Sequence, residues 1–251
     1  MAEGPQVLRR TEWLDRHLTG RKVLRCQSSR DDIPVESISS QRVERVFCHG
    51  KHIFIALDGG QILHNHLLMR GRWRKLSGQQ LFLPDGAWLS LYVGPHSVVN
   101  LNGQKLKLVQ HEIVDEQRAL LGPDLMTDPF PEVDVCTAIL ASHLPISEAL
   151  LDQSVVAGVG NIAKSETLYR AGLDPHIPAS GLSDQQMTRL VDAVQGVLWD
   201  SYHAGGRWVC RVYQRRGTRC GQCGGTIQST SLKPSGQTTY FCPGCQCGPG
   251  R

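Results

Sequence analysis

Short runs of alternating apolar and polar residues fill the first 115 residues, a pattern typical of strands with one buried face. The predicted strands span 22–26, 42–47, 52–57, 61–68, 88–93 and 105–109, with turn residues at 58–60, 84–86 and 102–103. One helix precedes them, from Gln6 to His17, with an apolar stripe of Val7, Leu8, Leu14 and Leu18. We therefore expect an antiparallel β-sandwich over residues 1–115.

The pattern changes after residue 115. Prolines at 123, 129 and 131 predict a linker over residues 116–131. Helical spacing follows at 133–143, 147–153, 161–171 and 183–202, where Ser183 and Gln186 form a capping-box pattern and Gly172 is placed to end the third helix. No helix is expected after Gly205. The fold class is α+β and multidomain, with a helical domain over 132–204 and a small module over 205–251.

The last module has the spacing of a zinc finger. Two Cys-x-x-Cys pairs, Cys220 with Cys223 and Cys242 with Cys245, supply four thiolates for one structural Zn²⁺. An iron–sulfur site and redox pairs are the alternatives. Cys247 is either a spare thiol or a substitute ligand. The intervening residues 226–241 predict a strand–turn–strand hairpin, with basic neighbours Arg215, Arg216, Arg219 and Lys233. Such a hairpin suits a DNA backbone, although zinc ribbons also serve as scaffolds or bind proteins.

Two glycines, Gly158 and Gly160, stand immediately before the helix predicted at Asn161. A helix N-terminus offers unpaired N–H groups and a positive dipole end, so this turn can hold a phosphate, with Asn161 as a donor. The simpler interpretation is a tight turn with a capping asparagine. A dinucleotide site is not expected, because no strong strand precedes the glycines.

The N-terminus carries a second candidate chemistry. Ala2 is small, so we expect Met1 to be removed and the α-amino group of Ala2 to be free. Such an amine has a pKa of about 7.7–8.0 and can form a Schiff base with an aldehyde-level carbon, and Glu3 beside it can move protons. Most N-termini are nevertheless inert.

Charge and composition narrow the class of partner. Apolar residues make up 40% of the 251 residues and the net charge is +4, with basic residues gathered toward both ends and an acidic middle. This distribution suits a polyanion held from two sides. The sequence contains no apolar run of membrane-spanning length and no secretory signal, so we expect an intracellular monomer, cytoplasmic or nucleoid-associated, without a membrane partner.

Taken together, several motifs resemble the formamidopyrimidine-DNA glycosylase/endonuclease VIII family, in the right order over nearly the whole chain. These are Glu3-Gly-Pro5, Gly50-Lys51, Gly158-Val-Gly-Asn161, the cysteine pairs, and the phrases at 121–124, 171–175 and 212–217. The resemblance is closer to the endonuclease VIII branch, because the opening matches that branch and the segment 205–212 is too short for a loop that cups oxidised purines.

The resemblance implies a β-sandwich, a helix–two-turns–helix region and a zinc finger, with damaged DNA, duplex or single-stranded, in a cleft. It implies base flipping, excision and strand cleavage through a Schiff base. Carried over, Ala2 is the nucleophile and Glu3 the acid, Lys51 and Asn161 hold phosphates near the lesion, Gly160 allows close approach of the backbone, and Met69 fills the gap left by the flipped base.

Two positions depart from the family pattern. Most members have proline where this chain has Ala2, and the hairpin arginine five residues before the third cysteine is Gln237. Alanine still supplies a primary amine, but its imine can deprotonate, and glutamine brings no charge to a phosphate. A catalytically reduced damage-binding protein is therefore the alternative to an active glycosylase, and a zinc ribbon that binds RNA or protein is a third hypothesis. The preferred lesion stays open, including bulky adducts and cross-links.

Overall fold

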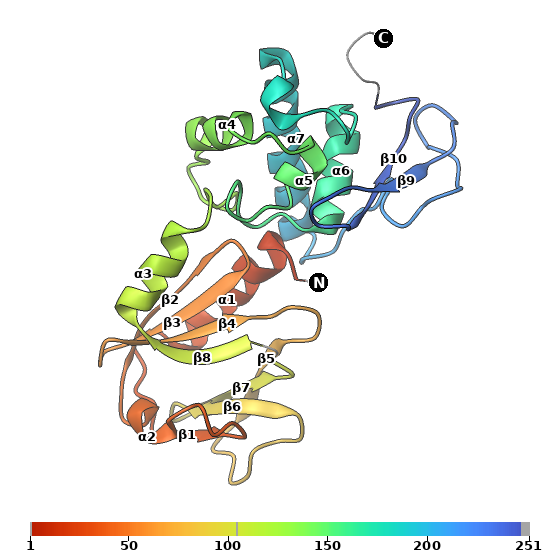
Figure 1. Ribbon diagram of the computed structural model, residues 1–251. Coiled ribbons are helices and arrows are strands. Elements are labelled where there is room, and N and C mark those ends of the chain that lie inside the picture. Colours follow the sequence, from red (N-terminus) through yellow and green to blue (C-terminus); the bar gives the residue numbers. More distant parts are fainter. Residues whose placement is uncertain (1, 104, 247–251) are drawn as a thin grey trace. The chain divides into compact units, whose positions relative to one another are not determined.

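The computed structural model describes residues 2–103 and 105–246, so Cys247 lies outside the described residues. The chain divides into two compact units (Figure 1). The first contains Ala2 and Val7–Leu120, and the second contains Glu3–Gln6 and the chain from Leu121 onward. Among the described residues, none of the helices combines the length and apolarity needed to cross a bilayer.

The first unit is a sandwich of two antiparallel four-stranded sheets. One sheet has the order β1-β6-β7-β5, with β1 Arg25–Ser28, β5 Arg72–Ser77, β6 Ala87–Tyr92 and β7 His96–Leu101. The other has the order β2-β3-β4-β8, with β2 Val43–His49, β3 His52–Leu57, β4 Gln61–His66 and β8 Lys105–Gln110. The helices are α1 Gly4–Leu18, α2 Val35–Ile38 and α3 His111–Ala119.

One apolar core holds the sandwich together. It joins residues of both sheets, such as Ile55 and Leu89, with the stripe of α1 formed by Val7, Leu14 and Leu18. The predicted sandwich and the helix before it are thus confirmed, with Leu8 only half-buried. A buried polar pair spans the core, because the Trp73 indole donates to the Asn65 side chain at 2.9 Å.

The sequence pattern missed several elements of this unit. All six residues of β7 are buried, so this strand shows no alternation of apolar and polar residues. Helix α3 was not predicted, because it buries only Val114 and so has almost no apolar stripe. Its residues were assigned partly to the sandwich and partly to the linker. The first strand begins at Arg25 rather than Lys22, because Lys22 makes only an isolated bridge with Arg42. Strand β5 and the short helix α2 were not predicted either.

The second unit contains the predicted helices and hairpin. Its elements are α4 Glu132–Leu140, α5 Ile146–Ala149, α6 Asn161–Ala171, the 3-10 turn η1 Ala179–Gly181, α7 Asp184–His203, β9 Gln228–Ser231 and β10 Thr238–Phe241. The capping box of Ser183 and Gln186 is confirmed, as is the left-handed Gly172 (φ +66°) that ends α6. The helix expected at 147–153 is only one turn long; beyond it, the Asp152 carboxylate accepts hydrogen bonds from the N–H and hydroxyl of Ser154.

Histidines gather on one face of the second sheet, where the cross-strand register pairs His52 with His66 and His64 with Lys107. The His52 Nδ1 and His64 Nε2 atoms lie 2.8 Å apart. Burial is the main cause that lowers the pKa of His52 to about 3 and those of His64 and His66 to about 4, with neighbouring positive charges adding to it. All three rings are therefore neutral near pH 7.

These neutral histidines should make the first unit sensitive to acid. In the unfolded chain these histidines have a pKa of about 6.5, whereas in the folded chain they stay neutral down to about pH 4. As the pH falls from about 6.5 to about 4, protons therefore bind the unfolded chain preferentially, and the free energy of unfolding should decrease. Above about pH 6.5 these histidines should leave the stability unchanged. Urea unfolding near pH 7 and pH 5 measures this loss. His64→Gln should lose less stability between the two conditions than the wild type, whereas the exposed control His143→Gln should match it. Equal losses in all three proteins would contradict the assignment.

Candidate functional site

The carboxylate of Glu3 caps the N-terminus of α6 in place of a local side chain. Its Oε2 accepts hydrogen bonds from the N–H groups of Gly160 at 3.1 Å and Ala163 at 3.0 Å, and its Oε1 accepts from Ile162 at 3.0 Å. Gly160, the residue before the helix, has no side chain to do this. Glu3 is buried, with 1% of its surface exposed, and these three donors together with the helix dipole stabilise its ionised form.

Gly160 is required by this packing. A Cβ at that position would lie 2.4 Å from the Glu3 Cδ atom, too close for any side chain. The helix N-terminus was expected to bind a phosphate, but the N–H groups of Gly160, Ile162 and Ala163 donate to Glu3 instead. The side chain of Asn161 remains the predicted phosphate donor at this turn.

Asn161 is the first residue of α6, as the sequence predicted. The ring of Tyr213, on the segment that follows α7, stands edge-on to that of Tyr240 with the centroids 5.3 Å apart. The Asn161 Oδ1 atom is buried and has no hydrogen-bond partner among the described residues. Burial raises the pKa of Tyr213, so its hydroxyl stays protonated at neutral pH. The Asn161 side chain therefore presents an unpartnered oxygen at the start of α6.

The backbone nitrogen of Ala2 is fixed by the loop that carries Met69. It donates to the Leu68 carbonyl at 3.0 Å. Leu68 has φ +48°, and the Gly71 N–H closes the turn on the Leu67 carbonyl at 2.8 Å. Met69, between them, has 64% of its surface exposed. The structure thus brings the predicted nucleophile position and the predicted gap-filling residue to one loop.

Lys51 lies in the two-residue turn between β2 and β3, where His49 pairs with His52 across the hairpin. Gly50 takes the first position of this turn with φ +57°, a conformation that favours glycine. Lys51 is buried, with 8% of its surface exposed. Ala2, Lys51 and Met69 belong to the first unit, whereas Glu3, Asn161 and the hairpin belong to the second.

The four predicted cysteines form one cluster. The sulfur atoms of Cys220, Cys223, Cys242 and Cys245 all lie within 4.8 Å of one another. The Cys220–Cys245 and Cys223–Cys242 sulfur pairs are 3.7 and 3.5 Å apart, close to the roughly 3.8 Å expected for tetrahedral metal–sulfur bonds of about 2.3 Å. The Tyr169 hydroxyl lies 3.2 Å from the Cys220 sulfur, a contact that the sequence gave no signal for. The group can hold a metal ion.

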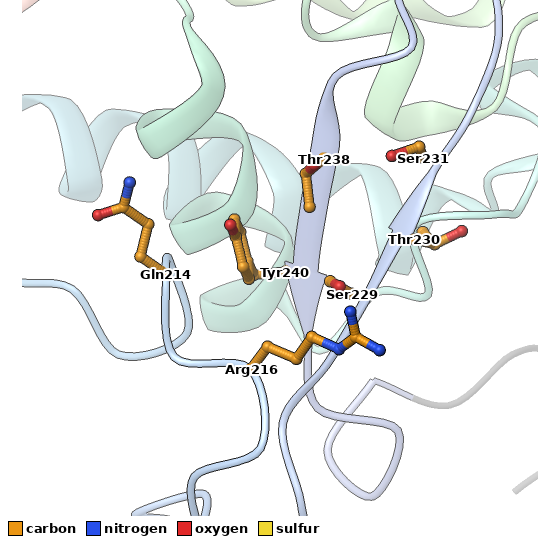
Figure 2. Close-up of a pocket in the computed structure, with 7 residues that line it drawn as sticks. All are labelled: Gln214, Arg216, Ser229, Thr230, Ser231, Thr238 and Tyr240. Atoms are coloured by element: carbon orange, nitrogen blue, oxygen red, sulfur yellow. The ribbon is translucent and has the colours of Figure 1, made fainter.

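The outer side of the hairpin bears a polar pocket of about 470 Å³ (Figure 2). Hydroxyl groups and one guanidinium line it, with no carboxylate; the lining residues are Gln214, Arg216, Ser229, Thr230, Ser231, Thr238 and Tyr240. Hydroxyl, amide and guanidinium donors are the groups that proteins use toward nucleic-acid phosphates. Gln237 lies next to this pocket in the chain, is exposed, and donates its backbone N–H to the Ser235 hydroxyl at 3.1 Å.

Two further buried carboxylates organise the second unit, and sequence reasoning assigned neither of them a role. Glu166 accepts from the N–H groups of Arg211, Val212 and Tyr213 at 2.8–3.0 Å. Glu148 accepts from the N–H and hydroxyl of Ser235 at 2.7 and 3.0 Å. Because each acts on backbone far away in sequence, no local motif could have revealed them.

Comparison with known proteins gives two matches, one in each unit of the chain. Residues 1–109 match the model of the formamidopyrimidine-DNA glycosylase N-terminal domain, and residues 121–210 match the formamidopyrimidine-DNA glycosylase H2TH domain. The chain belongs to the formamidopyrimidine-DNA glycosylase/endonuclease VIII family. The resemblance drawn from the motifs is thereby confirmed.

Relatives under both names resemble this family member over nearly its whole length. It is 32% identical to "Endonuclease 8 2" of Mycobacterium bovis, over 98% of this chain and 100% of that one. It is 34% identical to the formamidopyrimidine-DNA glycosylase of Acidiphilium cryptum, over 96% of this chain and 98% of that one.

Solved structures support the fold. The formamidopyrimidine-DNA glycosylase of Lactococcus lactis, bound non-covalently to DNA containing an abasic site, aligns with a TM-score of 0.83 and 22% identity, over 98% of this chain and 99% of that one. The predicted α+β class, with its sandwich and helix–two-turns–helix region, is confirmed, and the cysteine cluster is consistent with a zinc finger.

The contact between Glu3 and Gly160 gives a direct test of the cap. Gly160→Ala should displace the Glu3 carboxylate from α6 and destabilise the chain by about 1–3 kcal/mol, the usual cost of overpacking a filled site. Gly181→Ala is the control, because the nearest atom to a Cβ there is 4.0 Å away. Thermal unfolding compares them. A Gly160→Ala protein that melts with the wild type would show that Glu3 does not depend on this glycine.

Proposed function

We propose that this DNA repair glycosylase excises a damaged base through the α-amino group of Ala2 and the carboxyl group of Glu3. The family assignment supports the reaction class, and the position of Ala2 supports the nucleophile. Its nitrogen is held by the Leu68 carbonyl, so loss of Met1 would leave a primary amine that is already oriented by one hydrogen bond. Glu3 follows it directly in the chain and is buried.

The reaction can be written with these two groups. The Ala2 nitrogen attacks C1′ of the flipped nucleotide, the bond between C1′ and the base breaks, and the base leaves with its electron pair and takes a proton from water. Glu3 takes the proton that the amine loses and returns one during ring opening of the sugar. The resulting Schiff base acidifies C2′, loss of a C2′ proton expels the 3′ phosphate, and water then releases Ala2.

Several side chains are proposed to contact the DNA. Lys51 and Asn161 are proposed to hold phosphates of damaged DNA, duplex or single-stranded, and Met69 to fill the space of the flipped base. Gly160 contributes by admitting Glu3. At the hairpin, Gln237 supplies a hydrogen bond without charge, and the neighbouring Arg216 and hydroxyl groups are suited to the same backbone.

We place the substrate among oxidised pyrimidines, the preference of the endonuclease VIII branch. The segment between α7 and Val212 is short and tied at both ends. The Gly206 carbonyl accepts from the Gln6 side chain at 2.6 Å, and Glu166 holds the backbone from Arg211. This leaves little chain to form a loop around a larger purine lesion.

The metal of the cysteine cluster is proposed to be one zinc ion. Four sulfur ligands close its coordination sphere, so the ion would hold the hairpin in shape and take no part in the reaction. The Tyr169 hydroxyl would donate to the Cys220 thiolate and support it from outside the coordination sphere.

Borohydride trapping tests the Ala2 amine. With an oligonucleotide panel of lesions, the mature wild type should give a covalent protein–DNA adduct that peptide mapping places at Ala2. Ala2→Pro should stay active and show stronger strand cleavage, because a secondary amine forms an obligate iminium. A chain whose N-terminus is acetylated is the matched control and should give no adduct.

Two other results would contradict the amine route. Excision by the acetylated chain without any adduct would assign the reaction to water activated by Glu3. Tight binding of damaged DNA without excision by any form would favour the catalytically reduced damage-binding protein.

Metal content and affinity test the zinc assignment. The protein should contain one equivalent of zinc, and chelation should unfold the hairpin and weaken DNA binding. Tyr169→Phe should lower zinc affinity by about 10–100-fold, measured by competition with a chromophoric chelator, while Tyr92→Phe in the first unit should not. Iron–sulfur absorption, or unchanged DNA affinity in the metal-free reduced protein, would overturn it.

A further inference from the structure

The turn of the hairpin is clamped by one buried carboxylate that comes from a distant helix. Glu148 lies on α5 and has 2% of its surface exposed. Its Oε2 accepts from the Ser235 N–H at 2.7 Å and its Oε1 from the Ser235 hydroxyl at 3.0 Å. Both hydrogen bonds are charge-assisted, the stronger class of hydrogen bond in proteins.

The Ser235 hydroxyl also connects Glu148 to the exposed residue Gln237. Ser235 Oγ accepts from the Gln237 N–H at 3.1 Å while it donates to Glu148. The Gly236 N–H closes the turn on the Leu232 carbonyl at 2.8 Å, with Gly236 at φ +64°. The turn is thereby fixed, and the side chains of Lys233 and Gln237 are both exposed on it.

A buried ammonium accompanies this clamp. Lys164 on α6 has none of its surface exposed, and its Nζ atom has no hydrogen-bond partner among the described residues. Burial lowers the pKa of Lys164 to about 8, and attraction to Glu148 first and Glu3 second opposes that shift. Lys164 and Glu148 are thus two buried side chains of opposite charge in the second unit.

We propose that Glu148 is a positioning residue for DNA binding. Through Ser235 it fixes the hairpin turn and so determines how Lys233 and Gln237 meet the DNA backbone. The inference rests on the proposed function for its DNA part, whereas the clamp itself can be measured without DNA. The contact between Glu148 and Ser235 links α5 to the exposed turn of the hairpin.

Ser235 allows the sharpest test, because this exposed residue can be changed with little risk to folding. In the metal-loaded full chain, Ser235→Ala and Glu148→Gln should each weaken DNA affinity about tenfold, the usual worth of one hydrogen bond to a charged group. The single-turnover excision rate at saturating DNA should be unchanged. Ser235→Thr keeps the hydroxyl and should restore wild-type affinity, and the exposed control Glu132→Gln should match the wild type.

The double variant separates one shared link from two independent effects. If Glu148 acts through Ser235, Glu148→Gln combined with Ser235→Ala should bind no more weakly than either single variant. Effects that multiply in the double variant, or a lower melting temperature with unchanged DNA affinity, would overturn the proposal.

Amide hydrogen exchange distinguishes failure of the clamp from failure of the proposed function. The Ser235 and Gln237 amides should exchange faster in Glu148→Gln than in the wild type, without any DNA present. Unchanged exchange would refute the clamp. Faster exchange in Glu148→Gln with unchanged DNA affinity would refute the role of Glu148 in DNA binding. If Lys233→Ala and Gln237→Ala also leave the DNA affinity unchanged, the proposed contact between the hairpin and DNA is refuted instead.

Discussion

Buried carboxylates that accept backbone N–H groups hold the second unit together. Glu3 binds the first turn of α6, Glu166 binds the segment entering the zinc-finger module, and Glu148 binds the hairpin turn. Each joins segments that are far apart in sequence. The contacts to the N–H groups of Gly160, Ala163 and Val212 are buried, and a buried N–H group without a partner is costly, so these carboxylates contribute to the stability of the unit.

This constraint changes the role of the N-terminal glutamate. As a general acid, Glu3 would need only to reach the substrate. The three N–H contacts also make it the cap of the helix that begins with Asn161, so the acid and the proposed phosphate-binding residue are positioned by the same interaction. Because the capping carboxylate fills the space beside Gly160, the residue at that position must be glycine.

The hairpin carries the uncharged Gln237 where the family resemblance led us to expect an arginine, and other contacts reinforce it. Loss of a positive charge at this position removes electrostatic attraction, so the geometry of the remaining hydrogen bonds matters more. The Glu148 clamp and the row of hydroxyl groups near Arg216 supply such geometry. A hairpin whose turn is tied to a helix, and whose cysteines can hold a metal ion, has few ways to move, which reduces the ordering that DNA binding would have to impose.

The sequence by itself determined the fold class, the four cysteines and the start of α6. Local rules decide these features: strand alternation, the spacing of metal ligands, and a glycine turn before a helix. The sequence did not predict strand β7, because all of its residues are buried and it shows no alternation of apolar and polar positions. It did not predict helix α3 either, because a single buried residue, Val114, forms no apolar stripe. Only the tertiary structure decided that Glu3 caps α6, that Tyr169 contacts Cys220, and that the buried Glu148 binds the hairpin turn. These contacts join residues up to 160 positions apart, and side chains that act on distant backbone leave no periodic trace in the sequence.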